Sequence, residues 1–329
     1  MKVVRLILLI LHLGIFLLLS GMLMNAYVPP KVFPFLNLLS LGFPFLITAY
    51  ILLTVFWILS WKKRAFVFLF LGLLFFNATI RWVNFSSEKD QTADLKMISF
   101  NTRAGLMGRD KLKEYLKNSG ADVILLQEDS GKELTDLGYH VSNPHGIFTV
   151  LSKHKIVDIK VINPDDEYLR IPCIQIDIEI KGKVYRFIDV YLHPFSFDKD
   201  MVKLNGDSEQ NEEKAKNVIK KLIPTFKKHQ DQVEVIKEIV KNSPYPVILA
   251  GDFNSVPNSY EYYHLADGLQ DAFVEAGNGS ATSFHDYKFP IRIDYIFTSK
   301  SIQAMSYKVD RSVKISDHYP VIATFKLEK

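Results

Sequence analysis

The chain has 329 residues, of which 48% are hydrophobic and 13% aromatic. This composition excludes wholesale disorder and suffices for a sizeable core. No acidic residue precedes Glu88, whereas the same stretch holds seven of the 40 basic residues, so the remaining 33 face all 36 acidic ones. The formal net charge of +4 therefore arises in the N-terminal stretch, and the slightly acidic remainder lacks the charge signature of a nucleic-acid-binding domain.

Three apolar runs in residues 1–85 predict a transmembrane anchor. The first, 6–28, is nearly continuous and long enough to cross a hydrocarbon core about 30 Å thick. The second covers 43–61, and the third, 65–80, is shorter and contains Asn77 and Thr79. A signal peptide is the rival interpretation of the first run, but more apolar sequence follows where a cleavage site would be expected. A buried helical hairpin of a soluble protein is the other alternative, disfavoured by the length of the acid-free stretch.

Basic residues predict the orientation of these spans. Lys2 and Arg5 precede the first span, and 62–64 is a run of three basic residues between the second and third. The positive-inside rule places both groups in the cytoplasm. With three spans the C-terminal domain is extracytoplasmic, and with only two it is cytoplasmic. The single cysteine, Cys173, excludes an intrachain disulfide and leaves the compartment open.

A polar linker, 86–93, separates the anchor from a domain predicted over 94–329. Its apolar runs alternate between strand and helix patterns, which indicates an α/β fold. One helix is expected over 110–118, and one or two amphipathic helices over 207–241, broken near Pro224. The expected strands cover 95–100, 123–126, 184–192, 246–250, 293–297 and 321–325.

Each apolar run delivers polar residues where the predicted strand ends, which is where rigid scaffolds present functional groups to open loops. One such case would mean little, whereas six in one chain indicate a site. The residues are Asn101, the pair Gln127 and Glu128, His193, Asp252 with Asn254, Asp294, and Asp317 with His318.

These segments resemble the endonuclease/exonuclease/phosphatase superfamily from about residue 95 to 325. The GDFN and SDH motifs, in this order and about 60 residues apart, are specific together although each is weak alone. The resemblance implies a two-sheet β-sandwich flanked by helices, a four-layer α/β/β/α arrangement. The motifs are ISFN at 98–101, LLQE at 125–128, GDFN at 251–254, RIDYIF at 292–297 and SDHYPV at 316–321.

The same resemblance implies residue roles. Mg²⁺ or Mn²⁺ would be held by Glu128, Asp317 and Asn101, since hard cations prefer oxygen ligands. Taken singly, each of these residues could equally be a surface acid or a turn-forming Asn. Ser152 and Lys153 resemble a substrate-side element. The catalytic group would be Asp252, which takes a proton from the attacking water or positions it, and Asn254, which orients that water or the phosphate. His318 and His193 would contact the phosphate, and Asp294 would orient His318 and raise its pKa.

The sequence thus predicts divalent-metal-dependent hydrolysis of a phosphoester, a phosphodiester in preference to a monoester, by a membrane-anchored domain. A water nucleophile needs no Ser or Cys constellation, and the chain has no GxSxG, GxxxxGK[ST] or CxxC motif. The substrate stays open among lipids, nucleotides and nucleic acid, with nucleic acid not favoured by the charge. The alternatives are an inactive, membrane-tethered module that binds a phosphorylated ligand, and a transporter, for which His12 is the one ionisable candidate within the spans.

Overall fold

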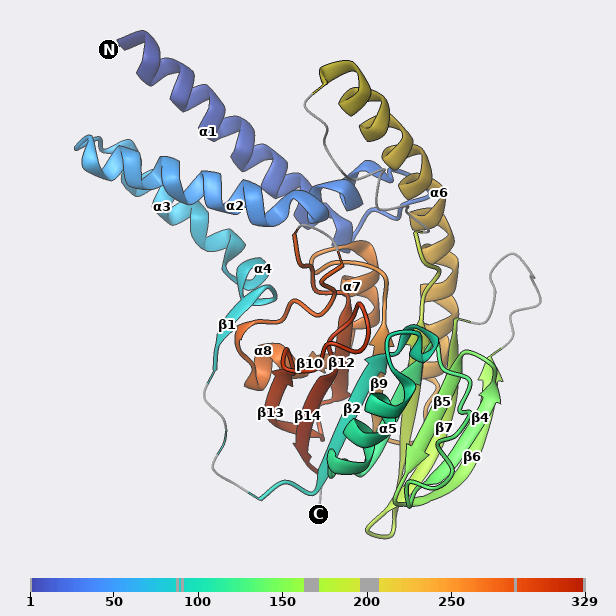
Figure 1. Ribbon diagram of the computed structural model, residues 1–329. Helices are drawn as coiled ribbons and strands as arrows, with labels where there is room; N and C mark the ends of the chain where they lie inside the picture. The colour runs from blue at the N-terminus through green and yellow to red at the C-terminus, as the bar shows by residue number, and fades with distance from the viewer. Residues whose placement is uncertain are drawn as a thin grey trace.

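The computed structural model describes residues 2–86, 89, 92–162, 172–195, 207–286 and 289–327. Two six-stranded sheets form the body of the molecule, and the N-terminal helices project away from it (Figure 1). The first sheet has the order β13-β14-β2-β3-β5-β4, with bounds Gln303–Val309, Val321–Lys326, Leu95–Asn101, Val123–Gln127, Phe148–Ser152 and His140–His145. The second has the order β10-β12-β9-β8-β7-β6, with bounds Leu269–Asp271, Asp294–Ser299, Val247–Asp252, Lys183–Tyr191, Cys173–Ile180 and Lys155–Ile162.

The two sheets pack face to face, and helices cover their outer faces. Alternate residues of both sheets, such as Met97, Leu125 and Phe187, are fully buried in the core between them. Helix α5 (Arg109–Asn118) packs Leu112 and Leu116 on the outer face of the first sheet. Helices α6 (Ser208–Lys241) and α7 (Tyr260–Leu265) cover the second sheet. The predicted four-layer sandwich is confirmed, and it also carries the short helix α8 (Ala272–Ala276).

Helix α6 corrects one prediction, because it runs unbroken through Pro224. A proline inside a helix removes one N–H donor and crowds the preceding turn, but it need not end the helix when packing holds both sides. Here Leu222 and Phe226, two residues before and two residues after the proline, are buried, and Val233 and Ile236 anchor the C-terminal half in the core. Tertiary packing therefore overrides the local break.

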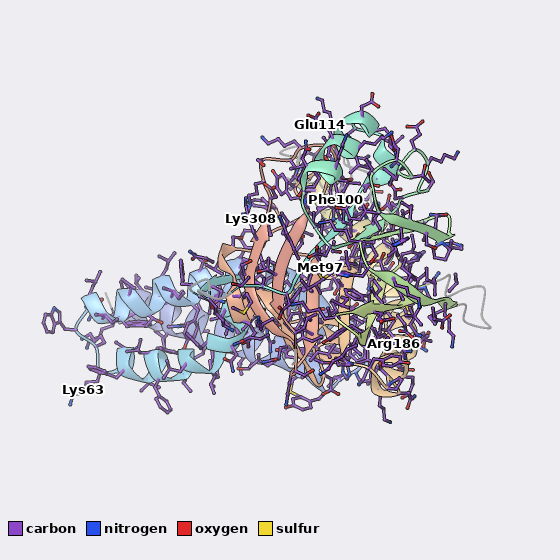
Figure 2. The ribbon with its side chains drawn as sticks, turned by 90° about the horizontal axis from the view of Figure 1, so that it is seen from below. Lys63, Met97, Phe100, Glu114, Arg186 and Lys308 are labelled. Carbon is purple, nitrogen blue, oxygen red and sulfur yellow. The ribbon has the colours of Figure 1, made fainter. Side chains whose placement is uncertain are left out.

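The N-terminal helices form a bundle whose far tip carries Lys63 (Figure 2). Large apolar side chains on these helices are exposed along the projection. Two helical segments, Lys2–Ala26 and Phe35–Leu59, are long and apolar enough to cross a membrane, and Arg64–Ile80 is a shorter apolar one. These are candidate anchors. In chain order the elements are α1 (Lys2–Leu23), η1 (Met24–Ala26), α2 (Phe35–Leu59), α3 (Arg64–Gly72), η2 (Leu73–Phe75) and α4 (Phe76–Ile80).

Helix α2 begins eight residues before the predicted second span, and this first part docks on the two-sheet body. Asn37 is buried and donates from Nδ2 to Glu261 Oε2 at 3.0 Å, while its Oδ1 accepts from the Tyr260 N–H at 2.9 Å. Ser40 donates to the carbonyl oxygen of Asn258 at 2.9 Å. Buried, mutually satisfied polar groups fix orientation, so the helices are firmly attached to the body.

A short strand follows the N-terminal helices and pairs with the body. Strand β1 (Val83–Phe85) pairs with β11 (Asn278–Ser280) of the body in a two-stranded sheet. The predicted linker, 86–93, starts directly after this strand, and its residues 87, 88, 90 and 91 lie outside the described part of the chain.

Candidate functional site

Six chain segments meet at one end of the sandwich. Strands β2 and β3 run parallel, with Asn101 opposite Gln127, and β8 and β9 run parallel, with Tyr191 opposite Asp252. The carboxyl ends of each pair therefore lie at the same edge. Strand β12 is antiparallel to β9 and begins with Asp294, directly opposite Asp252. The pairing of the strands therefore brings together side chains that are far apart in the sequence.

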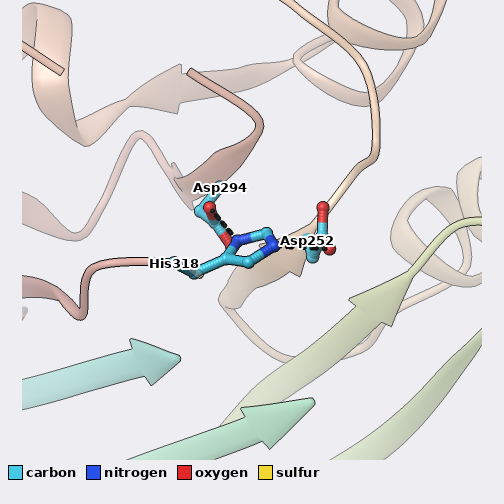
Figure 3. A group of neighbouring side chains, drawn as sticks. All are labelled: Asp252, Asp294 and His318. Atoms are coloured by element: carbon cyan, nitrogen blue, oxygen red, sulfur yellow. Dashed lines mark hydrogen bonds and ion pairs between the residues drawn. The ribbon is translucent and has the colours of Figure 1, made fainter. Parts of the chain in front are cut away.

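His318 lies between two carboxylates in this edge (Figure 3). Its Nδ1 is 2.9 Å from Asp294 Oδ2, and its Nε2 is 3.7 Å from Asp252 Oδ2. All three side chains are buried. Burial opposes a charged imidazole, but attraction to Asp294 and Asp252 outweighs it and raises the pKa of His318 to about 10. The expectation that Asp294 contacts His318 and raises its pKa agrees with this geometry.

For Asp252, the effect of burial on the pKa outweighs the attraction of its charged neighbour. Burial raises its pKa to about 7, against the attraction of His318, and repulsion from Asp294 adds to the increase. The N–H of Asn254 donates to Asp252 Oδ1 at 2.8 Å, and the Asn254 amide donates to Oδ2 at 3.2 Å and to the carbonyl oxygen of Leu192 at 3.0 Å. Asn254 therefore holds the carboxylate in place. A carboxylate with a pKa near neutrality is suited to exchange a proton at physiological pH.

Glu128 lies beside this group at the end of β3. Asn101 Nδ2 donates to both Glu128 Oε1 and Asp252 Oδ2, each at 3.0 Å, and so bridges the two carboxylates. The Tyr191 hydroxyl donates to the same Glu128 Oε1 at 2.8 Å. Asn101 Oδ1 accepts from the Arg103 N–H at 3.0 Å. Glu128 is half-buried, so one face of its carboxylate is oriented by protein and the other is open to the cavity.

Asp317, in the loop before β14, lines the same cavity. Arg103 Nη1 is 3.2 Å from Asp317 Oδ2 and 3.8 Å from Asp286 Oδ2. Ser316 orients this loop, because its hydroxyl donates to the carbonyl oxygen of Asn101 at 2.8 Å. The loop before β14 is thereby tied to the end of β2.

These groups surround a cavity of about 550 Å³. Four carboxylates line it, those of Glu128, Asp252, Asp286 and Asp317, whereas among its described lining residues the cationic groups are Arg103 and His318. An excess of convergent carboxylates is unfavourable unless a cation joins them, and oxygen donors of this type fit a hard divalent ion. The residues therefore fit a metal such as Mg²⁺ or Mn²⁺. Asp252, Asp294 and His318 also place ligand atoms within 4.8 Å of one another, but the raised pKa of His318 favours a proton over a metal on that ring.

Backbone strain accompanies the site. Glu128, Asn254, Arg103 and Ala104 all have φ between 45° and 56°, a left-handed conformation that costs free energy for residues other than glycine. Gly251, with φ of 139°, meets a different constraint, since a Cβ atom there would lie 2.0 Å from the carbonyl oxygen of Val190. The close approach of β8 and β9 at this edge requires a glycine.

His193 follows β8 but faces an adjoining cavity. That cavity, of about 330 Å³, is lined by His193, Glu128 and Tyr191 among others. The His193 N–H donates to Gln232 Oε1 at 3.0 Å, and its carbonyl oxygen lies 2.7 Å from His229 Nε2 on α6. The structure thus places His193 on the wall of this second cavity, which Glu128 also lines.

Ser152 and Lys153 do not join the site, contrary to expectation. Ser152 ends β5 opposite Val123, the first residue of β3, whereas Glu128 follows the last. Because β3 and β5 are antiparallel, Ser152 lies at the far end of the sheet. Its hydroxyl donates to the carbonyl oxygen of His154, and Lys153 Nζ donates to Gly120. The family resemblance suggested these two residues as a substrate-side element, but a local resemblance does not show which end of the sheet a residue occupies.

Two site residues escaped the sequence reasoning. Tyr191, the last residue of β8, precedes the predicted His193 by two positions, and its hydroxyl donates to Glu128. Arg103 follows the ISFN strand by two residues and supplies the cavity's guanidinium. Both residues lie at or just after the end of a strand, as the predicted site residues beside them do, so the same pattern could have identified them.

Two family models match this chain, one over the two-sheet body and one over the N-terminal helices. The family model described as "Endonuclease/Exonuclease/phosphatase family" matches residues 98–318, and a domain of unknown function (DUF8431) matches residues 5–82. No curated protein matches the chain.

Solved structures with the same architecture share little sequence with this chain. An endonuclease/exonuclease/phosphatase family protein from Bacteroides thetaiotaomicron is 17% identical, with a TM-score of 0.52 over 71% of this chain and 98% of that one. A functionally unknown conserved protein from Enterococcus faecalis V583 is 16% identical, with a TM-score of 0.51 over 71% and 100%. D. rerio TDP2 humanized by 14 mutations is 17% identical, with a TM-score of 0.50 over 70% and 98%. At these identities the likeness establishes the fold.

Proposed function

The chain belongs to the endonuclease/exonuclease/phosphatase family, and from this premise we propose that it hydrolyses a phosphoester, a diester in preference to a monoester, with the aid of a divalent metal ion. The observation that carries the proposal is the buried contact of His318 with Asp294 and Asp252 at the floor of an acidic cavity. A carboxylate with a raised pKa beside an imidazolium is a suitable pair for moving a proton while neutralising phosphoryl charge.

Each residue then has a role. Asp252 accepts a proton from the attacking water, and Asn254 holds Asp252 in position through its main-chain and side-chain N–H groups. His318, kept protonated by Asp294, donates from Nε2 to a phosphoryl oxygen. His193 contacts the phosphoester from the adjoining cavity. Water attacks phosphorus, the bond to the leaving oxygen breaks, and no covalent enzyme intermediate forms.

Glu128 and Asp317 would hold the metal, Mg²⁺ or Mn²⁺, with Asn101 and Tyr191 orienting Glu128. When bound, the ion supplies positive charge to the phosphoryl oxygens and orients the water. Arg103 partly neutralises Asp317 and presents its guanidinium to the same space. The Asn101 amide nitrogen faces both carboxylates, which keeps Glu128 and Asp252 close together before the substrate binds.

We also propose that residues 1–85 anchor the protein by three membrane segments, and that the catalytic domain, 94–329, is extracytoplasmic. The basic run 62–64 and the N-terminus lie at the far tip of the projection, away from the sandwich (Figures 1 and 2). Helices α1 and α2 each span the distance between the tip and the body, and α3 with α4 returns to it. The positive-inside rule places the tip in the cytoplasm.

Hydrolysis of bis-4-nitrophenyl phosphate by the purified full-length chain tests the catalytic proposal. We expect 4-nitrophenol release with Mg²⁺ or Mn²⁺, and its loss in EDTA. Asp252→Asn and His318→Gln each remove a group used for proton transfer or charge stabilisation and should lower kcat by about 10²–10⁴-fold. Lys160→Gln, exposed on β6 far from the cavity, is the matched control. A folded, metal-loaded protein that hydrolyses neither this diester, nor natural phosphodiesters, nor phosphomonoesters would contradict the proposal and favour a binding module.

A further inference from the structure

The cavity has an apolar half that the catalytic roles do not use. Helix α6 contributes Val218, Leu222 and Phe226, which recur every four residues and so lie on one face of the helix. Leu222 and Phe226 are buried. The ring of Phe226 packs edge to face against that of Phe195 in the cavity wall, with 5.5 Å between the ring centroids. The N-terminal half of α6, which carries Val218, rises from the sandwich on the same side as α1 and α2 (Figure 1).

The anchor supplies the facing wall. Leu41 of α2 lines the cavity together with Phe284, Ile291 and Ile293 from the loop before β12. Ile293 is also part of the hydrophobic cluster that holds the anchor helices together, and Phe284 packs against that cluster. The ring of Phe284 in turn packs edge to face against that of His318, with 5.0 Å between the ring centroids. A continuous apolar surface therefore leads from the helix bundle to the catalytic imidazole.

Leu41 lies within about one turn of the position where α2 leaves the protein body, since the ring of Phe45 still contacts that of Phe289. The residue before it, Ser40, is buried in the polar contact with Asn258, and beyond it Phe45, Ile51, Leu52 and Leu59 are exposed apolar side chains. Residues 42–59 would span about 27 Å at the helical rise per residue, close to the thickness of a hydrocarbon core. On this basis Leu41 lies at the membrane surface, and the cavity opens beside it.

We propose that α2 is part of the substrate site and that this site takes a lipid phosphoester, with its phosphate at His318 and its apolar chain along α2 and α6. The inference rests on the proposed function and names its substrate class. A nucleic-acid backbone would require a basic groove, whereas Arg103, the one Lys or Arg among the described residues of this cavity, is paired with Asp317 and Asp286. An apolar chain removes the half-buried Val218 and Leu41 from water, which is favourable in proportion to the area covered.

Two diesters with the same scissile bond test this inference on the full-length chain in lipid nanodiscs with Mg²⁺ or Mn²⁺. Methyl 4-nitrophenyl phosphate and hexyl 4-nitrophenyl phosphate both release 4-nitrophenolate and differ only in the alkyl chain. We expect kcat/KM for the hexyl ester to exceed that for the methyl ester by about tenfold or more, since each methylene placed in an apolar pocket adds to transition-state binding. Leu222→Ser and Leu41→Ser should each reduce this ratio by about threefold or more.

Ile219→Ser is the matched control, because Ile219 is exposed on α6 and does not line the cavity, and it should keep the wild-type ratio. If Leu222→Ser does not fold, Val218→Ser at the half-buried neighbouring position replaces it. Equal kcat/KM for the two esters, or an unchanged ratio in both Leu41→Ser and Leu222→Ser, would overturn the lipid inference while leaving hydrolysis intact. Failure of both esters would instead count against the proposed function. In that case, a larger rise in melting temperature with hexylphosphonate than with methylphosphonate, abolished by Leu222→Ser, would still support the apolar subsite, and equal rises would overturn it.

Discussion

At the level of single side chains, the protonation of His318 depends on its two carboxylate neighbours. Asp294 lies 2.9 Å from one ring nitrogen and Asp252 lies 3.7 Å from the other. Both partners favour the charged ring, and burial alone would favour the neutral one. The site therefore keeps a proton donor available at neutral pH, beside a carboxylate whose own pKa lies near 7.

A pH titration of the metal-free protein checks this balance. The folded-state pKa of His318, about 10, is above its ordinary value of 6.5. The contact thus adds stability that is complete below pH 6.5 and is lost as the pH rises from there through about 10. In a histidine-labelled NMR spectrum we expect one ring signal, absent from His318→Gln, to titrate well above pH 7. Titration of that signal at or below pH 6.5 would contradict the assignment.

The residue scale is also where sequence reasoning succeeded most and failed most clearly. Asn101, Glu128, Asp252, Asp294 and His318 were identified from short motifs, and the structure brings all of them to one edge. Tyr191 and Arg103 belong to the same edge but have no motif of their own, since a hydroxyl or a guanidinium near a strand end is common in any protein. Placement of Ser152 and Lys153 failed because strand direction is not visible in a local pattern.

At the scale of elements, the site depends on how closely β8 and β9 approach. Gly251 lies in β9 beside Val190 of β8, and a side chain there would collide with the carbonyl oxygen of Val190. The preceding run of apolar residues predicted the strand, but nothing local in the sequence shows that this glycine is required by a neighbouring strand. The continuity of α6 through Pro224 is similar, because the packing of Leu222 and Phe226 decides it.

Gly251→Ala should therefore be strongly destabilising. We expect a loss of about 4 kcal/mol or more in the free energy of unfolding, the range reached when a buried position is overpacked against backbone. Gly268→Ala provides the control, because Gly268 also has positive φ but no atom lies within 4 Å of an added Cβ. That variant should lose only about 1 kcal/mol, the cost of the left-handed conformation. Similar melting temperatures for the two variants would refute the steric account.

At the scale of the whole molecule, the N-terminal helices and the two-sheet body are joined by buried polar contacts rather than by a loose tether. Asn25 donates to the carbonyl oxygens of Leu36 and Asn258, and Asn37 bridges α2 to Glu261. Composition predicted the anchor, since the acid-free stretch is visible in the sequence. The docking was not predictable, because Asn25 and Asn37 are ordinary polar residues until their partners, more than 200 positions away, are known.

The proposed orientation of the molecule predicts a labelling pattern in spheroplasts. Cys173 is buried, so the natural chain should react little with a membrane-impermeant maleimide. Lys160→Cys, on the exposed surface of β6, should be labelled at once, whereas Lys63→Cys, at the tip of the anchor (Figure 2), should react only after the membrane is permeabilised. If both introduced cysteines react only after permeabilisation, the catalytic domain lies in the cytoplasm and the third apolar segment does not cross the membrane, which would contradict the proposed orientation.

The most direct test of metal-dependent hydrolysis at this cavity compares Mn²⁺ binding with turnover in two variants of the full-length chain. Glu128→Gln removes a proposed metal ligand, and Asp252→Asn removes the proposed proton acceptor. We predict that Glu128→Gln weakens Mn²⁺ binding, measured by electron paramagnetic resonance, by about tenfold or more and lowers turnover of bis-4-nitrophenyl phosphate with it. Asp252→Asn should instead lower kcat by about 10²–10⁴-fold while the protein still binds Mn²⁺. Wild-type turnover that persists in EDTA, or full activity in both variants, would contradict the central claim.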